Sequence, residues 1–395
     1  MLEFMDYVQH AFYKASGWDH EASYSHLTAT ARSLLEFETP RGVQLSLSSL
    51  SSPNFATSYG LGSVGLVDGS LSYLYTSHPL FSTIQSGKID LHDIIRGYRQ
   101  IEELRKPDEA WMWEEWHQGR HVDKRDTLLY GRLYLPQSTL EALYLRRISP
   151  TQQLRLSAVS DGRLRNGGTV LALYQYDVGK YNAETLYSTD GGLIGIRGLY
   201  NFGPDPRKGS QEPPRIEDRF YGRFSAGAEM YYGSLNKSGG VSFGGRFATL
   251  PAHKGTPLTA TLTLNPLMGN LSTTYAVKAG HNLSLCSKFD FNIYSYESDL
   301  ILGCELWRMK TKAQKRRERS MAAKLAWGLD EIVDIPEESE EVAGVLKARL
   351  DQDWKIGLVW EGRIKELLFT LGSSIDMKRR DQPFRALGLE VQYSS

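Results

Sequence analysis

The segment Leu258-Thr-Ala-Thr-Leu-Thr-Leu-Asn265 alternates apolar and polar side chains at every step. The same alternation ends the chain at Leu387-Gly-Leu-Glu-Val-Gln-Tyr393 and recurs in many segments of about ten residues. Successive side chains of a strand point to opposite faces, so each segment predicts a strand with one apolar and one polar face. Strands of this kind need an apolar medium beside them, and about ten residues is the length that spans a membrane.

About twenty segments carry the pattern, and merging one pair would leave nineteen. Short links such as Asp68-Gly69, Asp190-Gly191-Gly192 and Gly280-His281-Asn282 predict hairpin turns. The candidates lie near 30–38, 42–50, 55–67, 69–77, 127–136, 139–148, 151–159, 167–177, 180–188, 191–202, 219–232, 239–250, 256–265, 270–279, 282–294, 296–307, 345–352, 354–363, 365–376 and 384–394.

Sequential hairpins form an up-and-down meander, and an open meander leaves the backbone groups of its two edges unpaired. We therefore predict an all-β membrane protein, in which residues 1–395 form one closed up-and-down β-barrel of about nineteen strands. The competing structures, a soluble β-sandwich array or propeller, would show similar motifs every 40–50 residues, and the sequence shows none.

Three regions break the alternation. Residues 1–18 carry Phe4, Met5, Val8 and Phe12 at three- and four-residue steps, which predicts a short amphipathic helix. Residues 78–126 and 308–344 are predicted to be long loops that contain helix. The first loop has an apolar face made of Leu91, Ile94, Ile95, Tyr98, Ile101 and Leu104.

The predicted inner positions are small or polar, as Gln44, Ser48, Arg246, Glu390 and Gln392 show. An interior of this kind is wet, and a barrel of about nineteen strands is wider than its wall side chains can fill. The N-terminal helix is a natural plug for that lumen. The alternative is that the helix lies on the membrane surface.

Several classes of function are disfavoured. The net charge is zero, which gives no field to attract nucleic acid. The only cysteines, Cys286 and Cys304, fall on opposite strand faces and are predicted to be free thiols. The stretch Gly60-Leu-Gly-Ser-Val-Gly65 matches a dinucleotide fingerprint, but it lies in a strand-like segment with no helix after it. No catalytic motif or metal-ligand spacing is present, so we expect no enzyme, no cofactor and no metal.

Several stretches of the chain resemble the fungal family of mitochondrial distribution and morphology protein ten. They are Met1-Leu-Glu-Phe-Met-Asp-Tyr7, Gly69-Ser-Leu-Ser-Tyr-Leu-Tyr75, Tyr174, Leu264-Asn-Pro-Leu267, Lys288-Phe-Asp-Phe-Asn-Ile-Tyr294, Trp360-Glu-Gly362 and the terminal Gln392-Tyr-Ser. The resemblance covers nearly the whole chain apart from the two long loops, where the family varies. It implies a nineteen-stranded, porin-like barrel of the mitochondrial outer membrane, related to the voltage-dependent anion channel.

The resemblance also implies two roles. One is to anchor the ER–mitochondria encounter structure, which tethers the two organelles and supports lipid exchange and mitochondrial morphology. The other is to join the sorting and assembly machinery, which promotes biogenesis of outer-membrane β-barrels and of the protein translocase. The implied partners are the other subunits of the tether, the core barrel and peripheral subunits of the assembly machinery, and outer-membrane lipids.

The chain end resembles the insertion signal of mitochondrial barrels. Gly388, Val391 and Tyr393 match its glycine and its two hydrophobic positions, whereas Ala386 stands at the polar position, with Arg385 one place before it. A last strand with free backbone groups is one that an insertion machine can pair with.

Three groups of aromatic residues are candidates for partner binding. Tyr73 and Tyr75 share the outer face of one strand, and Phe289 and Phe291 share that of another. Such pairs occur at membrane interfaces as well as at docking surfaces, and both interpretations stay open. The third group lies in the first long loop, which is either a docking site or a self-packed helix, and consists of Trp111, Trp113 and Trp116.

The sequence leaves two other functions to be weighed. A metabolite or anion channel would use the same barrel with an open lumen, and a soluble β-rich enzyme would not need the membrane. A blocked lumen would favour a scaffold, whereas an open lumen would favour a channel.

Overall fold

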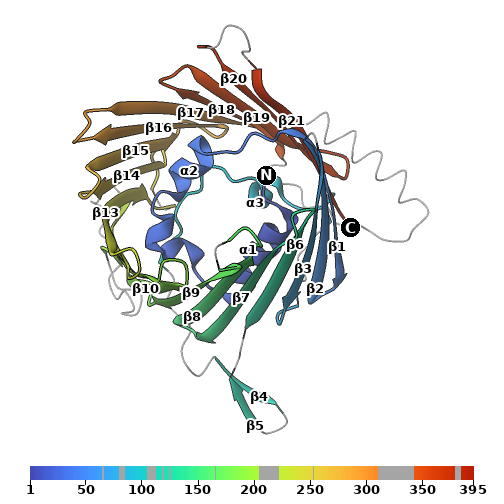
Figure 1. Ribbon diagram of the computed structural model, residues 1–395. Helices are drawn as coiled ribbons and strands as arrows, with labels where there is room; N and C mark the ends of the chain where they lie inside the picture. The colour runs from blue at the N-terminus through green and yellow to red at the C-terminus, as the bar shows by residue number, and fades with distance from the viewer. Residues whose placement is uncertain are drawn as a thin grey trace.

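Nineteen β-strands hydrogen-bond in chain order into one sheet whose last strand returns to the first (Figure 1). The computed structural model describes residues 1–64, 66–79, 85–104, 113–117, 120–123, 126–164, 166–203, 222–251, 253–309, 342–378 and 384–395. The barrel strands are β1 (Gly42–Ser52), β2 (Phe55–Val64), β3 (Leu66–Thr76), β6 (Thr127–Leu135), β7 (Thr139–Ser149), β8 (Gln152–Ser160), β9 (Gly168–Asp177), β10 (Tyr181–Ser188), β11 (Leu193–Asn201), β12 (Gly222–Gly233), β13 (Ser238–Thr249), β14 (Leu258–Asn265), β15 (Asn270–Lys278), β16 (Leu283–Asn292), β17 (Ser298–Met309), β18 (Val342–Asp351), β19 (Lys355–Ile364), β20 (Leu367–Asp376) and β21 (Phe384–Ser394).

The barrel closes where β1 pairs with β21. These two strands run parallel, with Gly42 opposite Gly388 and Ser48 opposite Ser394. All the other barrel pairings between described residues are antiparallel. An odd number of strands requires this arrangement, because the direction of the chain alternates from strand to strand and the first and last strands then point the same way. The closed meander predicted from the sequence is confirmed, including its strand number.

The two faces of the wall differ as the alternation predicts. On β14, Leu262 is 50% exposed on the outside, whereas its neighbour Thr261 is 6% exposed on the inside. Leu45 and Leu47 of β1 are likewise exposed, and Ser48 is buried. An apolar exterior of this extent requires an apolar surrounding medium.

The N-terminal segment, residues 1–41, runs inside the ring (Figure 1). It contains α1 (Phe4–Ser16), the 3-10 turns η1 (His20–Ala22) and η2 (Tyr24–His26), and α2 (Ala29–Leu35). Helix α1 lies against β2 and β3, and α2 lies against β15–β18. The helix predicted within 1–18 is confirmed, and it lies inside the barrel.

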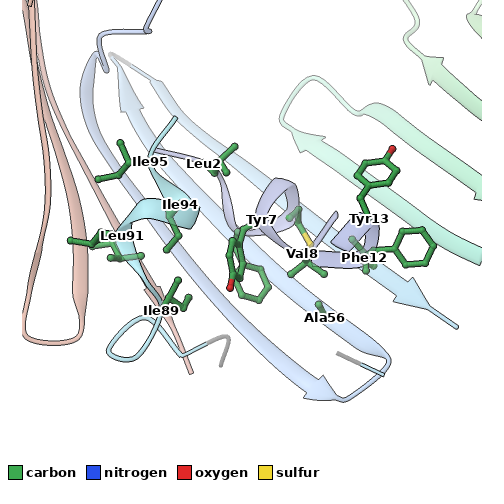
Figure 2. Close-up of a cluster of buried hydrophobic side chains, with 14 of the residues drawn as sticks. Leu2, Tyr7, Val8, Phe12, Tyr13, Ala56, Ile89, Leu91, Ile94 and Ile95 are labelled. Carbon is green, nitrogen blue, oxygen red and sulfur yellow. The ribbon is translucent and has the colours of Figure 1, made fainter. Parts of the chain in front are cut away.

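Helix α1 is held by apolar contacts that the sequence places on one face. Val8 and Phe12 are fully buried, and Leu74, Leu128 and Leu145 of the inner wall pack in the same cluster. Figure 2 shows this cluster together with residues of a second segment. The inner wall is therefore polar only in part, because it becomes apolar where α1 docks.

The second luminal segment, residues 85–104, belongs to the first long loop and returns into the barrel. Its short helix α3 (Leu91–Ile94) directs Leu91, Ile94 and Ile95 into the same apolar cluster (Figure 2). We call residues 85–104 the return segment. Like the N-terminal segment, it lies inside the ring (Figure 1).

Three sequence predictions are wrong in detail. Residues 30–38 were predicted as a strand, but 29–35 form α2, whose Ala31, Leu34 and Leu35 are buried at helical spacing. This removes one of the twenty candidate strands and leaves nineteen. The predicted turn at Asp68-Gly69 lies within β3, since β2 and β3 are already paired from Val64 and Leu66 onward.

The third difference is the helix expected from Leu91 onward. It ends at Ile94, and residues 96–104 are not helical. The backbone there bonds to the wall instead, as in the hydrogen bond from the amide of Tyr98 to Glu305 Oε2 at 3.0 Å. Gly97 lies so close to Glu305 and Trp307 that a Cβ would overlap their side chains. Wall contacts have replaced the helix's own hydrogen bonds.

The remainder of the two long loops is only partly described. A separate hairpin of β4 (Glu114–His117) and β5 (Arg120–Asp123) lies outside the ring (Figure 1). The second loop was predicted at 308–344, but β17 continues to Met309 and β18 begins at Val342, and residues 310–341 lie outside the described part of the chain. None of the helices described here is long and apolar enough to cross a membrane.

The packing of α1 gives a direct test. Phe12→Ala removes a fully buried ring and should weaken docking of α1 by roughly 3–5 kcal/mol. Lys14→Ala on the same helix removes only an exposed ion pair to Asp93 and should cost about 0–1 kcal/mol. Hydrogen exchange of the α1 amides measures both. Equal protection in the two variants would contradict the described packing.

Candidate partner-binding surfaces and the occupied lumen

Charged side chains of the inner wall hold both luminal segments. Lys347 Nζ lies 3.2 Å from Glu361 Oε2, and both residues are almost fully buried. Lys347 also donates to the carbonyl of Arg96 in the return segment, and the ammonium of Met1 pairs with Glu361. A buried ion pair persists only when its partners satisfy each other, so these contacts tie the luminal segments to β18 and β19.

On another part of the wall, two arginines bind luminal backbone. Arg223 Nη1 donates to the carbonyl of Glu102 at 3.1 Å, and Arg246 Nη1 lies 3.5 Å from the carbonyl of His26. The wall therefore contacts the return segment and the N-terminal segment through side-chain donors that the sequence places at inner positions.

Two histidines of the N-terminal segment lie beside a polar cavity. The rings of His20 and His26 are 4.2 Å apart between centroids and meet edge to face, and Tyr13 packs on His20. They line a cavity of about 200 Å³ together with side chains of β8–β11. Burial, followed by the neighbouring His20, lowers the pKa of His26 from 6.5 to about 3. The sequence offers no signal for this pair, because the spacing matches no known motif.

The outer wall carries an aromatic patch on β2 and β3. Tyr73 and Tyr75 are 43% and 45% exposed, and Tyr59 is 50% exposed. The Phe55 ring stacks on Tyr73 with centroids 5.9 Å apart. The predicted pair thus faces outward as part of a larger group, and we call these four residues the β2–β3 patch.

A second outward pair lies on β16. Phe289 is 42% exposed and stacks on Phe291 with centroids 6.5 Å apart and ring planes inclined by 6°. Strands β3 and β16 lie on opposite sides of the ring (Figure 1). One partner that docks on the β2–β3 patch would therefore leave the β16 pair free.

The loop tryptophans do not form a third outer surface in the described residues. Trp113 is 6% exposed, and the Arg147 guanidinium lies 4.7 Å from its ring centroid and 5.4 Å from that of Trp18. Trp116 lies in β4, of which the structure describes the backbone, and Trp111 lies outside the described residues.

The predicted insertion signal lies on the closing strand. Val391 and Tyr393 of β21 pair with Leu45 and Leu47 of β1. Gly388 points inward, and a Cβ there would overlap the backbone of Pro40. The N-terminal segment therefore passes over the inner face of β21 at Gly388 before it enters β1. This contact gives Gly388 a packing role in the finished barrel.

Gly388→Ala tests that role. The added methyl meets backbone, which cannot rotate away, so we expect a loss of roughly 1–3 kcal/mol in the free energy of unfolding. Gly240→Ala on β13 is the matched control, since a Cβ there meets nothing within 4 Å. Thermal unfolding of the purified barrels in detergent measures both, and equal midpoints would contradict the close crossing.

The depressed pKa of His26 predicts a pH dependence. The docked ring stays neutral while the released ring titrates near 6.5, so docking is strongest above pH 6.5 and weakens as the pH falls from 6.5 toward 3. Hydrogen exchange of the N-terminal segment, corrected for intrinsic rates, follows this loss. His26→Gln should reduce the pH dependence, and the exposed turn variant His281→Gln should retain it.

Comparison with known proteins shows which family the chain resembles. The family model of Mitochondrial distribution and morphology protein 10 matches residues 1–333 and 323–395. The chain is 78% identical to the protein of that name from Sclerotinia sclerotiorum and 63% identical to the one from Phaeosphaeria nodorum, in each case over the full length of both chains. The relative from Neurospora crassa is 45% identical, again with full coverage of both.

Proposed function

This chain belongs to the family of Mitochondrial distribution and morphology protein 10, and from that premise we propose that it is a non-enzymatic scaffold of the mitochondrial outer membrane. Membership gives the chain a role in mitochondrial distribution and morphology. The proposal adds that the barrel anchors the ER–mitochondria encounter structure, which supports lipid exchange. It also adds that the barrel joins the sorting and assembly machinery during biogenesis of outer-membrane β-barrels and of the protein translocase.

The observation that carries the scaffold proposal is the occupied lumen. Two segments, residues 1–41 and 85–104, lie inside the barrel and are held by a shared apolar cluster and by buried wall charges. A pore for metabolites needs a continuous wet path, and these segments narrow the space in which such a path could run. Scaffolding needs only the outer wall and the loops, and these remain available.

The two outer aromatic surfaces support a scaffold with two kinds of partner. Aromatic side chains are enriched at the points that dominate binding energy. Because the β2–β3 patch and the Phe289–Phe291 pair face different sides of the ring, we propose that each contacts a different membrane subunit. The partners are subunits of the tether and of the assembly machinery.

The closing strand supports the proposed route into the membrane. Gly388, Val391 and Tyr393 are on β21, which becomes the partner of β1 only when the barrel closes. Until then its edge is free to pair with an insertion machine. We propose that this strand is the insertion signal.

Paired alanine substitutions test the partner surfaces. Tyr73→Ala with Tyr75→Ala should remove one set of partners from affinity purifications by about tenfold, and Phe289→Ala with Phe291→Ala should remove the other set. The control is Tyr200→Ala with Phe202→Ala, an outer pair whose rings also touch, with centroids 4.9 Å apart. Equal loss of both sets from either double variant, or loss of the barrel, argues against two surfaces.

Conductance of the purified chain in planar bilayers separates the scaffold from the alternative, a metabolite or anion channel. The occupied lumen predicts low conductance through the unmodified barrel. A large, steady, anion-selective current would instead favour the channel, and would show that the luminal segments do not obstruct it.

A further inference from the structure

The cavity between the N-terminal segment and β8–β11 has the chemistry of an anion site. It measures about 200 Å³, far more than the roughly 10–15 Å³ that one water needs. Its lining includes two guanidinium groups, Arg155 and Arg197, and no carboxylate among the described residues. We propose that it binds inorganic phosphate or a phosphate monoester, held between Arg155 and the His20–His26 pair.

Arg155 supplies the unused charge. It has no ion pair or hydrogen bond with another residue in the described part of the chain, although it lies near enough to His20 and His26 to act on their charge. Arg197, by contrast, is engaged with Glu184 at 3.6 Å and with Glu229 at 3.4 Å. The described residues give Arg155 no direct ion pair, only a longer-range interaction with the Asp6 carboxylate, and an oxyanion that accepts two parallel hydrogen bonds suits its planar fork.

Gln153 favours an anion that carries a proton. Glu184 accepts from Gln175 Nε2 at 2.8 Å, and since a carboxylate only accepts, Gln175 must turn its Oε1 toward Gln153. Gln153 Nε2 donates to that oxygen at 3.0 Å. Among the described residues, Gln153 Oε1 is thereby left without a hydrogen-bond partner, although the Tyr13 hydroxyl contacts the same side chain, which is 1% exposed and lines the cavity.

A buried acceptor of this kind needs a donor. The hydroxyl of a partly protonated phosphate supplies one, whereas sulfate at neutral pH and a phosphate diester do not. The hydroxyls of Ser25 and Ser157, which also line the cavity, add donors for the remaining oxygens. We therefore expect the site to prefer phosphate and its monoesters to sulfate and to phosphate diesters.

Thermal unfolding of the full chain in detergent, at constant ionic strength and neutral pH, tests the site. Inorganic phosphate should raise the midpoint saturably, because a ligand bound only to the folded state stabilises it. Sulfate should raise it less. Arg155→Gln should weaken phosphate binding by about tenfold or more, Gln153→Leu should remove the preference over sulfate, and the exposed turn variant Arg163→Gln should bind as the unmodified chain does.

Short-chain phosphatidic acid and phosphatidylcholine distinguish the source of the phosphate. Tighter binding of phosphatidic acid than of inorganic phosphate assigns the site to a lipid monoester, and the reverse assigns it to a free phosphate. If Arg155→Gln does not fold, Arg155→Lys and titration of the unmodified chain by native mass spectrometry take its place. Equal effects of phosphate and sulfate, or undiminished binding in the Arg155 variant, would overturn the proposal.

Discussion

The hydrogen-bonded seam between β1 and β21 is the constraint on which the rest of the structure depends. Without it the sheet would have two free edges, and each unpaired backbone group facing hydrocarbon costs several kcal/mol. With nineteen strands the seam has to be parallel, and its register places Gly388 beside Gly42. The chain that leads to β1 therefore passes over the inner face of β21 at Gly388, where no side chain is in the way.

Closure also determines what happens inside. A ring of this size is too wide for its own side chains to fill, so the chain uses two of its own segments. The first enters by way of Pro40 beside Gly388, and the second enters at Ser86, whose amide donates to the carbonyl of Ser394 at 3.1 Å. Both luminal segments thus contact β21, the first at Gly388 and the second at Ser394. We infer that closure of the barrel and docking of the two luminal segments are coupled.

The strands of the wall could be predicted well from the sequence. Side chains of a strand alternate between its two faces, and lipid outside and water inside require apolar and polar residues in the same alternation. The segments around Leu262 and Leu389 show this, since one apolar residue in two is enough to set the face. The sequence predicted the interior poorly. Helix α2 is seven residues long, and only Ala31, Leu34 and Leu35 are buried apolar residues. So short a segment fits the helical and the strand periodicity equally well. Trp113 gave no sign of being buried on Arg147, and the cavity beside His26 combines residues from distant parts of the chain.

Cross-linking of the seam is the most direct test of the account. In a chain with Cys286 and Cys304 replaced by serine, Ser46→Cys and Gln392→Cys lie opposite each other on β1 and β21 and should form a disulfide on oxidation. Ser46→Cys with Val391→Cys, one residue out of register and on the other face, should not. A mobility shift without reductant for the first pair alone is the predicted result. No shift, or equal shifts for both pairs, would contradict a barrel closed in this register.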